Sequence, residues 1–335
     1  MLNLYTPEGY MDMGEVLASP YPFVVIIGAR GCGKTYGALK YVIEKDIRFL
    51  YMRRTKTILD VVTDPRYSPF KILNEDLHAD IIPEVSKHGY GIFKHEDTGE
   101  VAGYAAALST FANLRGFDGS DIDMLIWDEF IPEPSEIVRF DEFSAFTNAY
   151  ETINRNREFD GEPALKAILM SNSDLLYSGV VAGLNIADSL VKMQEEKIEV
   201  LEVSNDLVLI RPDSPEFYEK KKNTVLYRLT SGTDFSDMAL ENNFTVEDRS
   251  RIKARPLKEF NIVCSYKGLY IYKHKTDGTW YISRSGSGSP TEYKTTEADR
   301  RRYLREQTAV WRAFNKRKVY FENVSVQAVF LEIYN

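Results

Sequence analysis

The sequence predicts an α/β protein in which helices flank a mostly parallel sheet, followed by a small α+β domain at the C-terminal end. Three observations predict the larger part. An apolar strand runs into a glycine-rich loop and a helix over 23–45, and a second apolar strand follows at 47–52. A third strand, 124–127, ends in two carboxylates. A strand, helix, strand order is the opening of a parallel sheet, which binds ligands beyond the carboxyl ends of its strands.

The glycine-rich loop fits the phosphate-binding pattern G-x-x-x-x-G-K-[ST]. Glycines have no Cβ, so the backbone can adopt positive φ and turn N–H groups onto anionic oxygens, and the positive end of the following helix points the same way. We expect Lys34 to reach the β- and γ-phosphates of ATP and Thr35 to ligate Mg²⁺. The predicted nucleotide-binding residues are Gly28, Ala29, Arg30, Gly31, Cys32, Gly33, Lys34, Thr35 and Tyr36.

The strand 124–127 delivers Asp128 and Glu129 to its carboxyl end. An apolar strand that ends in Asp-Glu downstream of a phosphate-binding loop is the Walker B arrangement. We therefore predict that Asp128 holds Mg²⁺, directly or through water, and that Glu129 polarises the attacking water. Together the two motifs predict a P-loop NTPase fold.

Basic residues follow the second strand, where Arg53, Arg54 and Lys56 lie on the predicted active edge. One interpretation is a solvated strand end. The other is contact with phosphate, either of the nucleotide or of DNA.

Two further positions have open alternatives. Arg155 and Arg157 are expected in the last turn of a helix that begins near Asp141, where they either complement the helix dipole or supply an arginine finger to a neighbouring subunit. Asn172 follows a strand at 164–170 and either orients the lytic water or caps a turn.

The remaining elements are predicted in chain order. Before the connecting region they are a polar loop with a short helix (64–88), a hairpin (89–108), strands at 198–203 and 207–210, and a lysine-rich helix whose capping box lies within 213–216. After a polar connecting region (228–256), a three-stranded meander and an arginine-rich helix at 297–314 follow, as in the first half of a ribonuclease H-type fold. The first two strands of the meander, however, have no carboxylates to hold nuclease metals.

The net charge of −8 is unevenly distributed. Residues 256–335 hold 14 Lys and Arg against 8 Asp and Glu, which leaves −14 for residues 1–255. An anionic partner is the first expectation for the basic end. Because no apolar run approaches the roughly 18 residues needed to span a bilayer and the N-terminus has no leader pattern, we expect a cytoplasmic protein that is neither secreted nor membrane-bound.

Several segments, in the same order, resemble the encapsidation ATPases of small tailed phages with protein-primed genomes. The matching segments are IIGARGCGKTY, FLYMRRTK, LIWDEFI, NRNRE, LMSNS and GTDFSDMALEN. The resemblance implies a terminase-like ring motor, expected to be a homopentamer, that docks on the capsid portal and pumps linear double-stranded DNA inward using ATP. It also implies a P-loop domain of the additional-strand, catalytic-glutamate class and a C-terminal domain resembling a ribonuclease H fold without nuclease residues. The protein would act in the host cytoplasm, transiently on the procapsid.

Residue roles are carried over by position. The resemblance assigns catalysis to Glu129 and Lys34, makes Arg155 the trans-acting finger with Arg115 as a second candidate, and places Arg53 and Lys56 against DNA in the ring pore. In related members the tail engages a phage-encoded structural RNA, which makes RNA a candidate partner here. The expected domains are 1–212 (P-loop ATPase), 213–256 (helical connector) and 257–335 (basic, ribonuclease H-like).

A different class of function is also compatible with the motifs. A P-loop kinase or nucleotide switch would use the same loop, and its basic tail would bind an anionic partner. The glutamate after Asp128 favours attack by water. A third hypothesis, in which the tail is a terminase-like nuclease, requires metal-dependent cutting of DNA, which we do not expect.

Overall fold

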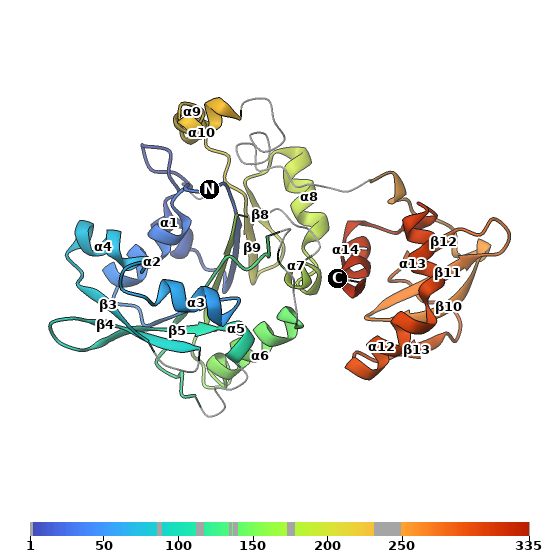
Figure 1. The fold of residues 1–335 in the computed structure, drawn as a ribbon, viewed down its shortest axis with the longest axis horizontal. Helices are drawn as coiled ribbons and strands as arrows, with labels where there is room; N and C mark the ends of the chain where they lie inside the picture. Colours follow the sequence, from blue (N-terminus) through green and yellow to red (C-terminus); the bar gives the residue numbers. More distant parts are fainter. Residues whose placement is uncertain are drawn as a thin grey trace. The chain divides into compact units, whose positions relative to one another are not determined.

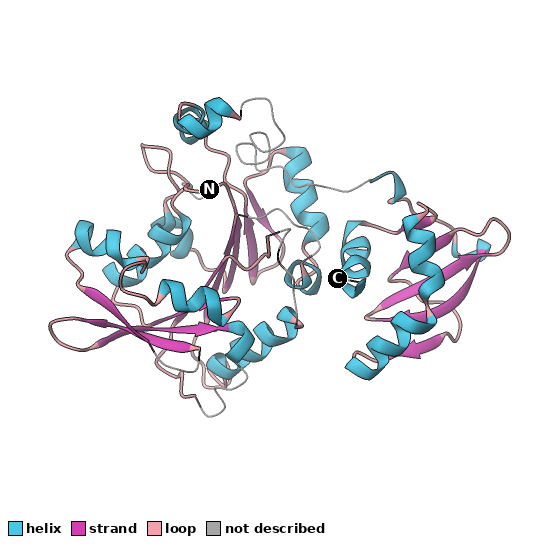
Figure 2. Ribbon diagram, in the orientation of Figure 1, coloured by secondary structure: helices cyan, strands magenta, loops and turns pink. Residues whose placement is uncertain are grey.

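The computed structural model describes residues 3–85, 89–111, 117–133, 136, 140–172, 178–230 and 249–334. The chain groups into two compact units, which Figures 1 and 2 trace by sequence and by secondary structure. One comprises Met1–Asp174 and Lys192–Phe244, and the other comprises Leu175–Val191 and Thr245–Asn335. The domain limits expected from the sequence remain predictions. This grouping differs from them at 175–191, which falls with the C-terminal residues rather than within 1–212.

A nine-stranded sheet in the order β3-β4-β5-β2-β6-β7-β1-β9-β8 forms the centre of the first unit (Figure 1). The strands are β1 (Phe23–Ile27), β2 (Phe49–Arg53), β3 (Ile81–Val85), β4 (Tyr90–His95), β5 (Val101–Ala107), β6 (Met124–Asp128), β7 (Lys166–Ser171), β8 (Val200–Glu202) and β9 (Leu207–Ile210). Six neighbouring strands of the sheet pair in parallel, in the order β5, β2, β6, β7, β1 and β9. Strands β4 and β3 at one edge and β8 at the other pair antiparallel. The predicted mostly parallel sheet is confirmed.

The register of this sheet brings four strand ends to one edge. Met52 pairs with Trp127, Asp128 with Met170, and Ile27 with Ser171. Because parallel strands end on the same side, the residues after β1, β2, β6 and β7 meet there. This edge carries the candidate site.

Helices cover both faces of the sheet. On one face Phe70 of α4 (Phe70–Leu77) packs on Phe49 and Phe93, with ring centres 6.0 and 4.7 Å away. On the other face, Phe146 of α6 (Glu142–Asn154) packs on Trp127, with ring centres 5.0 Å apart. Burial on both faces explains why the central strands are continuous apolar runs rather than alternating ones.

The other helices of the first unit precede, connect or follow these strands along the chain. They are α1 (Met13–Leu17), α2 (Lys34–Glu44), α3 (Lys56–Val62), α5 (Leu108–Phe111), α9 (Pro215–Lys222) and α10 (Val225–Leu229), and α8 (Ala187–Glu196) runs from the second unit into the first. The Asp141 carboxylate caps α6 by accepting from the Ser144 N–H at 3.0 Å. The expected capping box of α9 is shifted by one residue, since Ser214 rather than Asp213 is the N-cap.

Strand β3 differs from the expectation of polar loop and short helix over 64–88. The helix is α4, and β3 follows it as the edge strand beside β4. The Asn74 side chain fixes the junction, donating to the Ile81 carbonyl at 2.8 Å and accepting from its N–H at 2.9 Å. Pro83 lies within β3, and proline is tolerated on an edge strand because one side of the strand needs no donors.

A five-stranded sheet in the order β13-β10-β11-β12-β14 forms the second unit. Its elements are α7 (Gly179–Gly183), β10 (Phe260–Tyr266), β11 (Leu269–His274), β12 (Trp280–Ser283), β13 (Thr291–Tyr293), α12 (Glu297–Glu306), α13 (Thr308–Asn315), β14 (Val319–Phe321) and α14 (Val324–Tyr334). The predicted meander and small α+β domain are confirmed. One short strand, β13, precedes the helix, and the single helix expected at 297–314 is two, α12 and α13.

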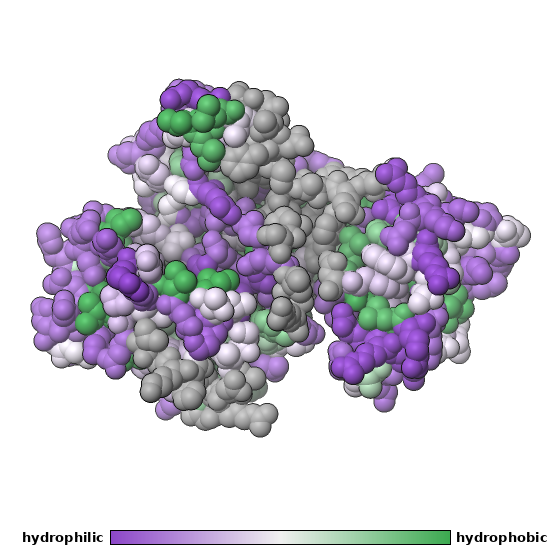
Figure 3. All heavy atoms as spheres, viewed as in Figure 1, coloured by the Kyte–Doolittle hydropathy of each residue, from purple (hydrophilic) through white to green (hydrophobic). Residues whose placement is uncertain are grey.

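Figure 3 shows a hydrophobic and a hydrophilic region, among others, on this face of the molecule. Hydrophobic residues show over α9 and α10 at the top, where Val225, Leu226 and Leu229 are exposed. Strongly hydrophilic residues cover α12 at the lower right. No helix in the described ranges is long and apolar enough to cross a membrane.

Candidate active site

The phosphate-binding loop joins β1 to α2 at the carboxyl edge of the sheet. Gly31 has a φ of 81° and Gly33, the N-cap residue of α2, a φ of 99°, as predicted. Gly28 is needed for a different reason, because a Cβ atom there would lie 2.6 Å from Cγ of Pro212. The loop therefore requires glycine at two positions for its backbone angles and at one for a close approach.

Lys34 is buried at the centre of this loop, with 5% of its surface exposed. Its Nζ donates to the carbonyl oxygens of Gly28 and Ala29 at 2.8 and 2.9 Å and to Asn172 Oδ1 at 2.7 Å. These acceptors are neutral, and Lys34 has no carboxylate partner in the part of the chain that the structure describes. Its positive charge is thus available to an anion held by the loop.

Thr35 and Asp128 face each other across the loop. Thr35 Oγ1 lies 3.1 and 3.2 Å from the two carboxylate oxygens of Asp128. Mg²⁺ prefers oxygen ligands and binds nucleotides through one or two protein oxygens together with phosphate oxygens. The hydroxyl and the carboxylate predicted to hold Mg²⁺ therefore fit that role in identity and in proximity.

Arg53 binds both carboxylates at the end of β6. Its Nη1 donates to Asp128 Oδ2 at 2.9 Å, and its Nη2 donates to Glu129 Oε2. The Tyr51 hydroxyl also donates to Asp128 Oδ2, at 2.7 Å, and burial followed by the neighbouring Asp128 raises its pKa well above the usual value. Glu129 itself has a φ of 56°, a strained conformation for a non-glycine residue.

This placement corrects the expectation that Arg53 contacts DNA. Its side chain is 9% exposed and is committed to two carboxylates, so it is not presented to a DNA backbone. Lys56, the other predicted DNA contact, is 42% exposed at the start of α3, where it pairs with Asp60 one turn along the helix. Of the two predicted DNA contacts, Lys56 is the one that remains on the surface.

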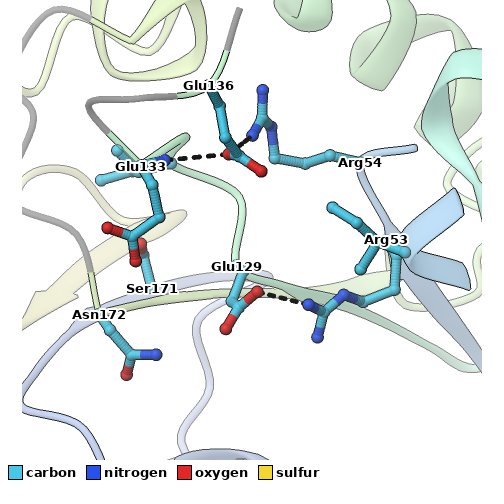
Figure 4. A pocket seen from close by; sticks show the side chains of 9 residues that line it. Arg53, Arg54, Glu129, Glu133, Glu136, Ser171 and Asn172 are labelled. Atoms are coloured by element: carbon cyan, nitrogen blue, oxygen red, sulfur yellow. Dashed lines mark hydrogen bonds and ion pairs between the residues drawn. The ribbon is translucent and has the colours of Figure 1, made fainter. Parts of the chain in front are cut away.

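A small cavity lies between the ends of β2, β6 and β7. Figure 4 shows the Glu129 carboxylate turned to Arg53, while Ser171 at the end of β7 and the next residue, Asn172, lie on the other side. The cavity volume is about 20 Å³. A water molecule needs roughly 10–15 Å³, so the space beside Glu129 is large enough for one.

Arg54 ties the loop after β6 to the start of α6. Its Nε donates to Glu142 Oε1 at 2.7 Å. Its Nη1 pairs with Glu136, which also accepts from the Glu133 N–H at 3.0 Å (Figure 4). Arg54 and Glu142 are almost completely buried. Burial raises the pKa of Glu142, and Arg54 opposes that effect.

The two arginines after α6 differ in availability. The helix ends at Asn154, so Arg155 is its C-cap residue and Arg157 lies beyond it, not in the last turn as expected. Arg157 is 11% exposed and donates to the Ser120 and Ile122 carbonyls. Arg155 is 46% exposed, donates to the Phe117 carbonyl at 2.8 Å and pairs with Asp118 at 3.3 Å. Arg155 is thus the more accessible of the two, and Arg115 lies outside the described residues.

The other predicted loop residues have partners around the loop. Arg30 pairs with Glu133, and the Cys32 Sγ lies 3.6 Å from Lys34 Nζ. The Tyr36 hydroxyl donates to Asp76 at 2.7 Å, and this hydrogen bond raises the pKa of Tyr36 to about 12. Tyr36 also lines a cavity of about 490 Å³ that Gly31 and Gly33 border. A nucleotide bound by its phosphates has room beside the loop there.

Tyr51 and the Arg54 to Glu142 pair were missed from the sequence. Their partners are 77 and 88 residues away along the chain. The only sequence signal was the placement of Tyr51 and Arg54 at the end of β2. That signal becomes specific only when β2 is known to pair with β6.

The fold and this edge of the sheet define a P-loop NTPase of the α/β class. The chain belongs to the podovirus DNA encapsidation protein (Gp16) family, whose family model matches residues 8–296.

Known proteins of this kind are similar over most of the chain. The DNA packaging protein of Bacillus phage phi29 is 26% identical over 305 residues, covering 88% of this chain and 83% of the phage protein. That of Bacillus phage B103 is 28% identical over 255 residues, covering 73% and 71%.

Two solved structures share the fold. The Phi-28 gp11 DNA packaging motor aligns with a TM-score of 0.67 at 16% identity, covering 99% of this chain and 97% of that one. The bacteriophage Phi-29 viral genome packaging motor assembly aligns with a TM-score of 0.64 at 23% identity, covering 97% and 98%.

Proposed function

We propose that the protein is the ATP-hydrolysing subunit of a ring motor that moves linear double-stranded DNA into a preformed capsid. The observation that carries this proposal is the convergence of Lys34, Thr35, Asp128 and Glu129 at one sheet edge in a chain of the DNA encapsidation family. The phi29 and B103 relatives are DNA packaging proteins, which supports the DNA and packaging parts of it.

The residues of the site have separable roles in hydrolysis. Backbone N–H groups of the loop and Lys34 bind the phosphates and offset the charge that develops on them. Thr35 and Asp128 would hold Mg²⁺, which supplies charge neutralisation at the phosphate oxygens when bound.

Glu129 is the proposed base for the attacking water. Among the described residues Arg53 engages its Oε2, which leaves Oε1 to accept a hydrogen bond from water in the adjacent cavity. Asn172, whose Oδ1 accepts from Lys34, would orient the same water. The Arg53 contact fixes the direction of the carboxylate.

Assembly into a ring, which we propose to be pentameric and seated on the capsid portal, completes the site. Arg155 would act on the nucleotide of a neighbouring subunit, because its described partners are Thr152, Phe117 and Asp118 rather than its own phosphate loop. Lys56 is the proposed contact to the DNA backbone in the pore. Such contacts give affinity without sequence preference.

The basic second unit is the proposed site for a structural RNA. Arg301 and Arg305 of α12 have side chains that are 78% and 77% exposed, although each also lies near a glutamate. We expect binding of structured RNA by the full chain to fall with salt and with Arg301→Gln and Arg305→Gln together. RNA binding that is unchanged by both substitutions would remove this partner assignment.

A packaging assay tests the proposed function. Protein, portal-bearing procapsids, linear duplex DNA and ATP are incubated, and the DNA that becomes resistant to nuclease is measured. We expect protection with the wild-type protein and none with Glu129→Gln. ATP hydrolysis without DNA protection, accompanied by phosphate transfer to a small molecule, would instead favour a kinase or nucleotide switch.

A further inference from the structure

Helix α9 carries three consecutive lysines in its last turn, and only one of them approaches the phosphate-binding loop. Lys222 pairs with Glu219 at 3.1 Å, and Lys220 donates to the Glu8 carbonyl. Lys221 turns to the loop, where a Cβ atom on Gly31 would lie 3.4 Å from Lys221 Nζ. The sequence alone did not distinguish these three side chains.

Aromatic side chains hold Lys221 in this position. Its Nζ lies 5.6 Å from the centre of the Phe217 ring and 5.2 Å from the centre of the Tyr227 ring. Both rings are buried. An ammonium group over ring faces gains a cation–π attraction, which restrains the flexible lysine stem without neutralising its charge.

The N-terminal segment fixes α9 against the loop. Tyr10 packs edge-on against Phe217 with ring centres 5.9 Å apart, and a Cβ atom on Gly9 would lie 2.8 Å from Cβ of Glu216. The same segment bonds to the loop itself, through the Met11 N–H and the Cys32 carbonyl at 2.9 Å. The N-terminal segment therefore joins α9, which carries Lys221, to the loop.

The electrostatics at this point favour an anion. Within the described residues Lys221 forms no ion pair. Burial lowers the pKa of Lys221, and the nearby charges of Lys34 and Arg30 lower it further, while Cys32 acts in the opposite direction. Several cations gathered around backbone N–H groups repel one another until a negative group binds between them.

We propose that Lys221 is a second phosphate-binding lysine, which reaches from α9 to a phosphate oxygen of the nucleotide held by the loop. The inference rests on the proposed nucleotide binding and adds a residue from outside the sequence motif. Because α9 lies at the start of the helical connector expected at 213–256, this contact would make the position of α9 depend on the bound nucleotide.

Nucleotide affinity tests the proposal without relying on turnover. Lys221→Met keeps the apolar stem against Phe217 and Tyr227 but removes the charge, and Lys222→Met is the matched control on the same turn. Fluorescence titration with an ATP analogue in Mg²⁺ is expected to give a Kd raised about 10- to 150-fold for Lys221→Met, the range for loss of a charge-assisted hydrogen bond. Lys222→Met should remain within about twofold of wild type, and Lys221→Arg should recover most of the affinity.

Thermal melting separates a binding role from a purely structural one. Since Lys221 is repelled by its neighbours in the free protein, Lys221→Met should melt at or above the wild-type temperature without nucleotide, and ATP should raise its melting temperature less. The inference would be overturned if Lys221→Met bound the ATP analogue as tightly as Lys222→Met does. A lower melting temperature of Lys221→Met with that unchanged affinity would point to a purely structural role. If the wild type itself binds no ATP, the proposed function fails instead.

Discussion

Arg53 Nη1 lies 2.9 Å from Asp128 Oδ2, so the arginine at the end of β2 is bonded to the carboxylate proposed to hold Mg²⁺. The same guanidinium binds Glu129, the proposed base, through its other terminal nitrogen. One planar group therefore sets the relative position of the two acidic residues. Any shift at the end of β2 is transmitted to both.

Replacing Arg53 should impair hydrolysis more than nucleotide binding. Arg53→Gln leaves Glu129 without its orienting partner, and we expect kcat to fall by about 10²-fold, the cost of a misplaced catalytic group. The measurement is steady-state ATP hydrolysis together with ATP affinity. Arg66→Gln, an exposed arginine paired with Asp64, is the control. A kcat that is unchanged by Arg53→Gln would contradict the positioning role.

Arg155 should act between subunits. Arg155→Ala and Glu129→Gln are each expected to abolish hydrolysis while binding ATP, because each removes one half of a shared site. Mixed rings would contain some interfaces with an intact Glu129 on one subunit and an intact Arg155 on the next. Mixing the two inactive proteins should therefore restore part of the hydrolysis rate. No recovery in rings verified to contain both proteins would place Arg155 outside the neighbouring site.

The buried pair of Arg54 and Glu142 should contribute strongly to stability. Glu142→Ala leaves a buried guanidinium with its exposed partner Glu136 alone, and we expect the free energy of unfolding to fall by about 3 kcal/mol. Glu151→Ala, at an exposed position of the same helix, should change it by less than about 0.5 kcal/mol. Urea unfolding measures both. Equal effects of the two substitutions would show that the ion pair adds nothing.

Lys166 predicts a pH dependence of stability. Burial lowers its pKa from 10.5 to about 8, so between these pH values the unfolded chain binds more protons than the folded one. The contribution of Lys166 to the free energy of unfolding should thus rise with pH, by about 1–2 kcal/mol between pH 7 and 9.5. Lys166→Met, which cannot titrate, should lose this rise relative to wild type. A constant difference between the two proteins across that range would contradict the assignment.

Local sequence patterns predicted the parts of the fold that depend on neighbouring residues. The strand before Gly28, the helix after it, the strand ending at Asp128 and the meander from Phe260 were all predicted from short stretches. Each has a clear pattern of apolar residues or a backbone requirement, such as the positive φ of Gly33. The Thr35 to Asp128 contact also agrees with the motif logic.

Features that depend on strand order were not predictable in this way. The basic residues of FLYMRRTK looked alike in sequence, yet Arg53 is buried against Asp128 while Lys56 is exposed. The difference arises because β2 pairs with β6, a partner 75 residues away for Arg53. Likewise, Lys221 is distinguished from Lys222 only by the packing of α9 on the N-terminal segment.

ATP hydrolysis as a function of protein concentration, with and without linear duplex DNA, tests the central claim most directly. Wild type and Glu129→Gln are compared. The proposed motor predicts a rate per subunit that rises with concentration and with DNA, because each site needs its neighbour, and that is lost in Glu129→Gln. A rate that is independent of both concentration and DNA, or that survives in Glu129→Gln, would contradict it.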